Sequence, residues 1–242
     1  MKKYNDCDLK SCFLCRNSLA SWLPAIEGHK RNFIMRKGEA IFHEGDGVKG
    51  IYFLYKGTVK VHKRWGSEKE LILSFAKPGD IIGYRGLGNE KVYPVTATAI
   101  EPVTVCFIDL SFFETTLEVN PRLTLSLMKF YANELQEAER RMRNLAHMEV
   151  KGRLAETLLH LRNRFGLAKE GYIDILLTRQ DIASFTGTTY ETIFRVMNEM
   201  SEEKLIRVQG KKIFLLKEAK LEKLLDVKNL PQARKEGPQK KK

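Results

Sequence analysis

The stretch TRQDIASFTGTTYETIFRVMNEM, residues 178–200, predicts two short helices joined by a tight bend. Thr178 can cap the first helix, and Asp181, three residues later, completes a capping box. Gly187 supplies the backbone conformation that a sharp bend between helices requires. The runs LIRVQG and KKIFLL that follow, residues 205–216, are β-prone and turn at a glutamine–glycine pair, which is typical of the hairpin of a winged helix. The stretch therefore predicts a helix-turn-helix followed by a wing.

Such a module places its second helix in the major groove of DNA, where Arg suits guanine and Glu suits the cytosine amino group. Threonines, arginines and lysines at helix starts and in the wing are natural phosphate binders. An ordinary helical hairpin with a charged face is the alternative, but the spacing of Ala183 and Gly187 and the following wing favour a DNA reader. The predicted DNA contacts are Thr178, Arg179, Thr188, Thr189, Tyr190, Glu191, Phe194, Arg195, Lys211 and Lys212.

The composition agrees with a DNA-binding protein. The 242 residues carry a formal net charge of +12, which suits a polyanionic partner, and 43% hydrophobic residues are enough for real cores. No apolar run is long enough to span a membrane and no apolar leader opens the chain, so we expect a cytoplasmic protein without membrane contact. The sequence has no motif of a Ser-His-Asp catalytic triad, no phosphate-binding loop and no paired-carboxylate motif. We therefore expect that the chain is not an enzyme.

Four changes of pattern divide the chain into five expected parts. Short β-type runs broken by glycines indicate a compact β-roll or jelly roll, and Asn120-Pro121 is a signal for the start of a helix. The expected parts are a cysteine-bearing segment at 1–22, a β-roll sensor domain at 23–118, a dimerisation helix at 119–148, a winged helix-turn-helix DNA-binding domain at 149–227 and a basic disordered tail at 228–242. The predicted fold class is α+β.

The expected long helix carries a narrow apolar stripe with a seven-residue repeat. Packing against the β-domain is one explanation, but a stripe this narrow on a highly charged helix favours self-association. A two-fold dimer would also present two recognition helices to the halves of a palindrome, about one helical turn apart. The predicted homodimer interface consists of Met128, Tyr131, Leu135, Ala138, Met142 and Leu145.

The four cysteines have the spacing of metal ligands. Cys7, Cys12 and Cys15 form a C-x4-C-x2-C pattern, and Cys106 is a distant fourth. This is the spacing of plant-type ferredoxins, and soft sulfur ligands suit an iron–sulfur cluster or zinc. Cysteines that only pack, or that act as thiol redox sensors, remain alternatives, because a lone cysteine in a strand such as Cys106 is by default a core residue.

The order of β-roll, long helix and winged helix resembles the CRP/FNR family of bacterial transcription regulators. The motifs that carry the resemblance are KGTVKV (56–61), ELILSF (70–75) with PGDIIG (78–83), GRLAETLLHL (152–161) and TRQDIASFTGTTYETIFRVM (178–197). The resemblance covers roughly residues 33–216. It implies a dimer whose β-roll senses a signal, which binds promoter DNA and which acts on RNA polymerase.

The resemblance also bears on the signal. In the cyclic-nucleotide branch a Glu after PGDIIG binds the ribose, and an Arg-Ser pair holds the cyclic phosphate. Tyr84 and Tyr93-Pro94 stand at those positions here, which argues against cyclic AMP, because a buried phosphate would lose its bidentate Arg partner. Arg85 lies close by, but at a different position of the motif.

Resemblance to the FNR branch implies a [4Fe–4S] or [2Fe–2S] cluster on Cys7, Cys12, Cys15 and Cys106 that senses oxygen, nitric oxide or redox state. The FNR spacing has its two-residue gap first, so this chain departs from it. The alternative is a regulator gated by a small organic effector or by haem in the β-roll, with His29 and His43 as possible haem ligands. Its cysteines would then bind zinc or act as thiol sensors.

Within the recognition helix, Glu191 and Arg195 match the family's Glu and Arg that contact bases in a TGA-type half-site. Tyr190 and Phe194 depart from the family pattern. Phe194 could meet a thymine methyl group or simply contact sugar.

Overall fold

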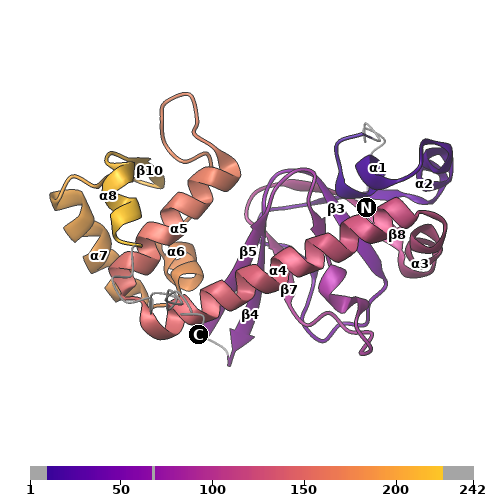
Figure 1. The fold of residues 1–242 in the computed structure, drawn as a ribbon, viewed down its shortest axis with the longest axis horizontal. Helices are drawn as coiled ribbons and strands as arrows, with labels where there is room; N and C mark the ends of the chain where they lie inside the picture. Colours follow the sequence, from indigo (N-terminus) through magenta and orange to yellow (C-terminus); the bar gives the residue numbers. More distant parts are fainter. Residues whose placement is uncertain (1–9, 67–68, 226–242) are drawn as a thin grey trace, which may run out of the picture. The chain divides into compact units, whose positions relative to one another are not determined.

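The computed structural model describes residues 10–66 and 69–225, and it confirms an α+β fold with two compact units that divide between Ala146 and His147 (Figure 1). Each unit has its own core. The expected tail at 228–242 and Cys7 lie outside the described residues.

The first unit contains two four-stranded antiparallel sheets. One sheet has the order β1 (Arg31–Met35), β8 (Val103–Asp109), β3 (Gly50–Lys56) and β6 (Ile81–Ile82). The other has the order β2 (Ala40–Phe42), β7 (Thr96–Ala99), β4 (Val59–Trp65) and β5 (Lys69–Ala76). These strands fall within the β-prone runs of the sequence, with turns at the glycines between them. The predicted β-roll is therefore present.

Strand β8 has core residues on both of its faces. Val103 and Val105 belong to a cluster that also contains residues of β4 and β7, so this cluster fills the space between the sheets. Cys106 and Ile108, on the other face, join a second cluster formed with residues of the helices. Because side chains alternate along a strand, the register of β8 decides that Cys106 faces the helices and not the roll interior.

Three short helices around the second cluster were not predicted from the sequence. They are α1 (Phe13–Asn17), α2 (Leu23–His29) and α3 (Leu110–Val119), with single 3-10 turns η1 (Ala20–Trp22) and η2 (Tyr84–Leu87). Asp109 caps α3 by accepting a hydrogen bond from the Ser111 backbone amide at 3.0 Å. Phe113 of α3 is fully buried in the second cluster. These helices are short, so their periodicity is too brief to stand out in the sequence.

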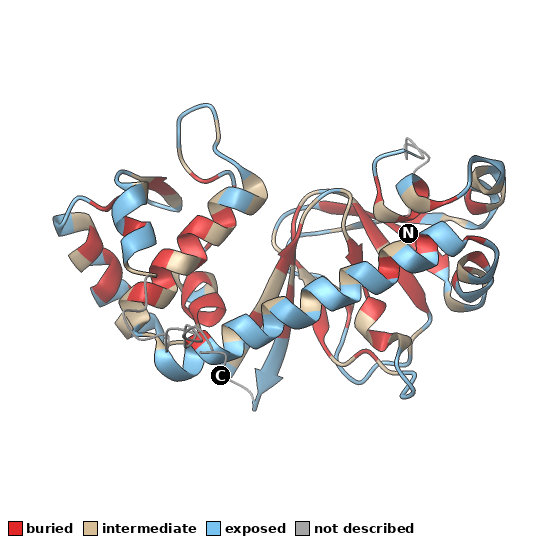
Figure 2. Ribbon diagram, in the orientation of Figure 1, coloured by how far each residue is buried: buried red, intermediate tan, exposed pale blue. Residues whose placement is uncertain are grey.

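Helix α4 (Pro121–His147) is the predicted long helix. Leu123 and Leu127 pack into the second cluster, with Phe130 against it. Farther along, the Arg141 guanidinium donates hydrogen bonds to the backbone carbonyls of Ile72 and Leu73 in β5. Apart from Tyr131, the residues of α4 that pack on its own β-roll are distinct from the apolar stripe, and most of the helix surface is exposed (Figure 2).

The second unit is a winged helix. Its elements are α5 (Val150–Phe165), α6 (Arg179–Thr186), α7 (Tyr190–Glu202), β9 (Ile206–Gln209), β10 (Lys212–Leu215) and α8 (Glu218–Lys223). Helix α5 ends at Gly166, as its sequence predicts, and Leu154, Leu158 and Leu161 are buried.

A partly buried cluster of polar and charged side chains joins strands β4 and β5. The fully buried His62 places Nδ1 2.9 Å from Glu70 Oε2 and Nε2 2.9 Å from Thr98 Oγ1. Lys60 Nζ lies 2.6 Å from the other Glu70 oxygen. Burial raises the pKa of Glu70, but contacts with His62 and Lys60 outweigh this and lower its pKa from 4.5 to about 2. The carboxylate is therefore charged throughout the physiological pH range.

Glu70→Gln should destabilise the fold by about 2 kcal/mol at pH 7. A carboxyl whose pKa is lower in the folded chain stabilises above its unfolded pKa, and this contribution is lost as the pH falls from about 4.5 to about 2. Urea unfolding measured between pH 2 and 7 should therefore give a shallower acid dependence for the variant. Glu44→Gln removes the exposed pair with Lys63 and is the control, with a loss below about 1 kcal/mol. Parallel pH curves for wild type and Glu70→Gln would contradict this assignment.

Candidate nucleic-acid interface and sensor site

The capping box and the bend of the helix-turn-helix form as the sequence predicts. Thr178 Oγ1 accepts a hydrogen bond from the Asp181 backbone amide at 3.0 Å, and the Asp181 carboxylate accepts one from the Thr178 amide at 3.1 Å. Gly187 adopts a left-handed conformation, φ 74° and ψ 49°, which ends α6. The Thr188 amide then donates to the Ala183 carbonyl at 3.0 Å. These local bonds fix the direction in which α7 starts.

Arg153 of α5 holds this bend, and the sequence reasoning did not single it out. Its guanidinium donates to the carbonyls of Thr186, at 3.2 Å, and Gly187, at 3.3 Å. Burial lowers the pKa of Arg153. An arginine one residue before the apolar Leu154 and Ala155, near the start of the motif GRLAETLLHL, is the signal that could have pointed to this role.

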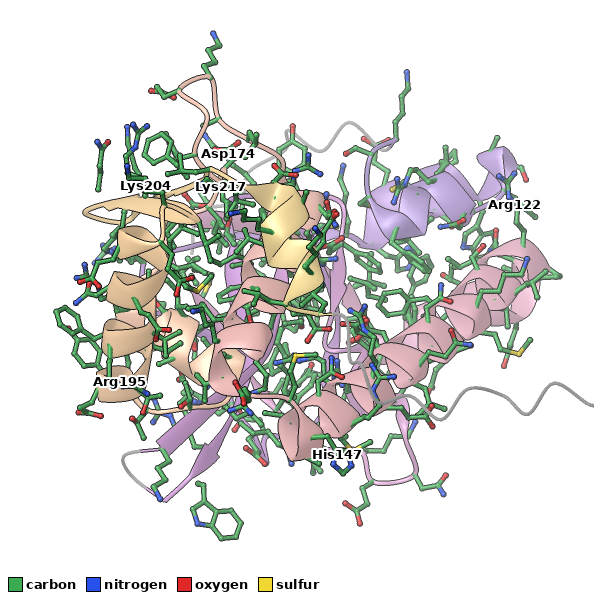
Figure 3. All side chains as sticks on the ribbon, turned by 60° about the vertical axis from the view of Figure 1, so that its left-hand side comes forward. Arg122, His147, Asp174, Arg195, Lys204 and Lys217 are labelled. Atoms are coloured by element: carbon green, nitrogen blue, oxygen red, sulfur yellow. The ribbon has the colours of Figure 1, made fainter. Side chains whose placement is uncertain are left out.

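Helix α7 separates an inner apolar face from an outer face. Ile193, Val196, Met197 and Met200 are buried, while Tyr190, Glu191, Phe194 and Arg195 are exposed. Figure 3 shows Arg195 on the outside of the helix, pointing away from the unit's core. Lys151 of α5 contacts Glu199 at 2.7 Å and Glu203 at 2.6 Å, which anchors the C-terminal half of α7. The exposed side chains of the N-terminal half of α7 are therefore available to bind a ligand.

Four other predicted contacts, Thr178, Arg179, Thr188 and Thr189, lie at the starts of the two helices. Arg179 begins α6, Thr189 caps α7 by accepting from the Thr192 amide at 3.3 Å, and Thr188 precedes it. Helix N-termini carry unsatisfied amides and a partial positive charge, so both starts suit phosphate groups. The Arg179 guanidinium lies 5.4 Å from the centre of the Phe194 ring. The structure therefore brings the start of α6 beside the outer face of α7.

The wing is a two-stranded hairpin in which Gln209 pairs with Lys212, so its turn is Gly210–Lys211, one residue later than predicted. Lys211 is exposed at this turn. The Lys212 ammonium lies 4.5 Å from the centre of the Tyr172 ring and is half-buried. Arg207, which the sequence reasoning did not select, is exposed and lies 4.2 Å from the Phe214 ring centre. The wing thus adds positive charge near the helix-turn-helix.

In the first unit, the turn after β6 is tied to α4. The Tyr84 hydroxyl donates a short hydrogen bond to the Glu134 carboxylate, and Arg85 Nη2 lies 2.7 Å from the same oxygen. The Tyr131 hydroxyl donates to the Tyr84 carbonyl at 2.5 Å. Burial raises the pKa of both tyrosines, so they remain protonated donors. The residue at the expected ribose-binding position is therefore engaged with α4.

Tyr93 fills the expected cyclic-phosphate position in the roll. It is 2% exposed, stacks on Phe42 with ring centres 4.0 Å apart, and donates to the Gly50 carbonyl at 2.6 Å. Burial raises the pKa of Tyr93, so it stays neutral. A neutral phenol in this place offers a cyclic phosphate no charged partner.

Three of the predicted cysteine ligands share one apolar cluster. Cys12 caps α1, and its Sγ accepts a hydrogen bond from the Cys15 amide at 3.4 Å. Cys12, Cys15 and Cys106 are all buried in the cluster under the helices. Among residues 10–66 and 69–225, however, no three His, Cys, Asp or Glu side chains form a group that could hold a metal ion. The three described cysteines therefore share the apolar cluster without forming a metal-ligand group by themselves.

The heptad stripe of α4 is exposed. Met128, Leu135 and Met142 are 64%, 61% and 60% exposed, and Ala138 and Leu145 are exposed too. The alternative in which the stripe packs on the chain's own β-roll is wrong, with the exception of Tyr131, which reaches Tyr84. An apolar stripe of this length on a solvent-exposed surface is typical of a protein interface.

Comparison with known proteins identifies both units. Residues 34–120 match the cyclic nucleotide-binding domain, and residues 152–224 match the Crp-like helix-turn-helix domain. The chain is 34% identical over 178 residues to the cAMP-activated global transcriptional regulator CRP of Salmonella typhimurium, across 72% of this chain and 83% of that protein. The chain belongs to the CRP/FNR family. Electron transport regulator A of Shewanella oneidensis, another relative, is 31% identical over 186 residues, 75% of this chain and 73% of that protein.

A solved structure supports the same fold. FixK2 from Bradyrhizobium japonicum superposes with a TM-score of 0.72 at 26% identity, covering 81% of this chain and 96% of that one. Members of the CRP/FNR family are DNA-binding transcription regulators, typically dimeric, and not enzymes. This chain is accordingly a DNA-binding regulator. Within the described part of the chain, no helix has the length and apolar character to cross a membrane.

Proposed function

We propose that this CRP/FNR regulator binds a pseudo-palindromic promoter site as a homodimer, reads it with Glu191 and Arg195, and acts on RNA polymerase from there. The dimer would close through the α4 stripe of Met128, Leu135 and Met142. The observation that carries the DNA-reading part is the outer face of α7, where these two charged side chains are exposed beside two helix starts suited to phosphate. Glu and Arg have the donors and acceptors that match cytosine and guanine edges.

For the signal we propose an iron–sulfur cluster held by Cys7, Cys12, Cys15 and Cys106. In its favour, three of these cysteines already share one buried apolar cluster, and cysteine sulfur is the usual ligand of such a cluster. Among the described residues these cysteines form no metal-ligand group by themselves, so the proposal depends on Cys7, which lies outside the described residues. A bound cluster would supply sensitivity to oxidants; the chain's own contribution is to tie it to α4.

The contacts around α1 support this coupling. Leu14 of α1 shares its cluster with Leu123 and Leu127 of α4. The buried Asn120, just before α4, accepts a hydrogen bond from the Leu19 amide at 2.8 Å and donates to the Thr116 carbonyl at 2.8 Å. A displacement of α1 would therefore alter the packing where α4 begins, and α4 carries the proposed dimer stripe.

A small organic effector in the β-roll is the second candidate, because residues 34–120 match the cyclic nucleotide-binding domain. Cyclic AMP itself suits this roll poorly, since Tyr84 is engaged by Glu134 and Tyr93 by Gly50. Of the residues suggested for haem, His29 stacks on Phe112 with ring centres 3.9 Å apart and bonds the Ala25 carbonyl, while His43 is exposed.

Anaerobic reconstitution with iron and sulfide tests the cysteine proposal. We expect wild-type protein to gain visible absorbance and to change its DNA affinity by about 5- to 150-fold on exposure to air, the range typical of allosteric coupling. Cys106→Ser should lose the absorbance and the air response together, while its melting curve reports whether the fold survives. Cys106→Ala repeats the test with an apolar replacement.

The outcomes separate the candidates. In the protein as purified, before reconstitution, bound zinc without colour would assign the cysteines to zinc, and a Soret band would indicate haem. Wild-type protein that takes up no iron, or binds DNA equally with and without it, would remove the cluster and leave the organic effector ahead.

A further inference from the structure

The outer face of α7 carries an aromatic pair beside its charged pair. Tyr190 and Phe194 stack with ring centres 6.4 Å apart and an interplanar angle of 17°. They are 42% and 43% exposed, although aromatic rings of this size are usually buried. The two rings lie one helical turn apart, in a row next to that of Glu191 and Arg195. The helix therefore presents one polar row and one apolar row to whatever it binds.

The Phe194 ring is held in place before any ligand arrives. Tyr190 stacks with it, and the Arg179 guanidinium lies 5.4 Å from its centre, at a distance suited to a cation–π contact. Side chains that are already ordered lose less conformational entropy when they bind. The ring does not contribute to the core, because Ile193, Val196 and Met197 fill the core side of α7. A pre-ordered, half-exposed ring on a recognition helix is consistent with a binding role.

The major groove offers little that an apolar surface can bind. Base edges there display hydrogen-bond donors and acceptors, and the apolar exception is the C5 methyl group of thymine. Covering polar edges with two aromatic rings would remove water without replacing its hydrogen bonds, which is unfavourable. A methyl group, in contrast, gains by leaving water. An apolar row that faces the major groove would therefore favour a methyl-bearing pyrimidine.

We infer that Tyr190 and Phe194 bind the C5 methyl group of a pyrimidine in each half-site, beside the base pair read by Glu191 and Arg195. This inference rests on the proposed DNA-reading function of α7 and adds the chemical group that sets its specificity. Because 5-methylcytosine carries the same methyl group at the same ring position, the pair accepts it at the cytosine's place where the other base contacts permit. Methylation of a matching site would then raise affinity.

Replacing thymine by uracil tests this, because uracil lacks only the methyl group. A duplex site is first selected from a random pool with the full-length wild-type protein, and each thymine is then replaced singly by uracil. At one thymine position in each half-site we expect the dissociation constant to rise about fourfold, the value of one buried methyl-sized group, and at the other positions to stay unchanged. Replacing that thymine's base pair by one with 5-methylcytosine should bind more tightly than the pair with plain cytosine.

Two variants assign the effect to the aromatic row. Phe194→Ser should bind thymine and uracil sites equally, whereas Arg195→Ala should keep the thymine-to-uracil ratio while losing affinity. If wild type binds every uracil-substituted site as tightly as the parent, or if Phe194→Ser keeps the ratio, the methyl assignment is wrong and Phe194 contacts sugar instead. If the selection enriches no sequence at all, the DNA-reading proposal itself fails, which is a distinct result.

Discussion

Leu135→Glu should leave the protein monomeric at concentrations at which the wild type is a dimer, with operator binding largely lost. Leu135 is 61% exposed at the middle of the α4 stripe, so the substitution leaves the monomer's core intact. In a two-fold dimer the new carboxylate would face its symmetry mate in an apolar seam, at a cost of several kcal/mol, roughly 3–5 by analogy with an unpaired buried charge. Light scattering gives the mass, and anisotropy titration gives DNA affinity.

Gln136→Glu is the matched control, because it adds the same charge at the neighbouring, exposed position outside the stripe. It should remain a dimer and bind DNA like the wild type. A Leu135→Glu protein that stays dimeric with unchanged strength would exclude this stripe as the interface.

Arg195→Ala should weaken binding to the cognate site by about 1–3 kcal/mol in each half-site and change binding to random DNA little. The reason is that an arginine in the major groove makes two hydrogen bonds to guanine, and these exist only on the correct sequence. Arg195 is exposed on α7, so the folded state should be unaffected. Titrations on both DNAs at several salt concentrations measure the difference.

Lys211→Ala is the contrasting variant. Lys211 lies at the tip of the wing and would contact phosphate, so its loss should weaken cognate and random DNA about equally and lower the salt slope by roughly one. Equal losses on both DNAs for Arg195→Ala would reassign Arg195 to phosphate contact.

The parts that could be predicted from sequence are those whose signals are local. The capping box of Thr178 and Asp181 and the left-handed Gly187 act within a few residues, so the sequence contains everything that decides them. The heptad stripe was visible for the same reason. The β-runs were found because glycines mark their ends, although a run alone does not say which sheet it joins.

The parts that could not be predicted depend on contacts between distant residues. Arg153 holds the bend only because α5 packs beside it, 33 residues away from Thr186 in sequence. The His62 cluster needs the pairing of β4 with β5, which neither strand's own sequence specifies. Helix α3 was missed because its ten residues show little periodicity. Cys12 and Cys15 are buried in the same cluster as Cys106 because of the way α1 folds. The spacing of the cysteines in the sequence does not predict this fold.

Tyr131 would take part both in the proposed dimer seam and in the fold of its own β-roll, which has a thermodynamic consequence. It lies in the exposed stripe of α4, and its hydroxyl holds the Tyr84 carbonyl at the turn after β6. A dimer that covers this stripe would restrict the Tyr131 side chain and so stabilise its hydrogen bond to the Tyr84 carbonyl. By reciprocity, whatever loosens the turn must weaken the dimer by the same free energy. The melting temperature of the β-roll should consequently rise with protein concentration, because a dimer formed only by the folded state stabilises that state by mass action.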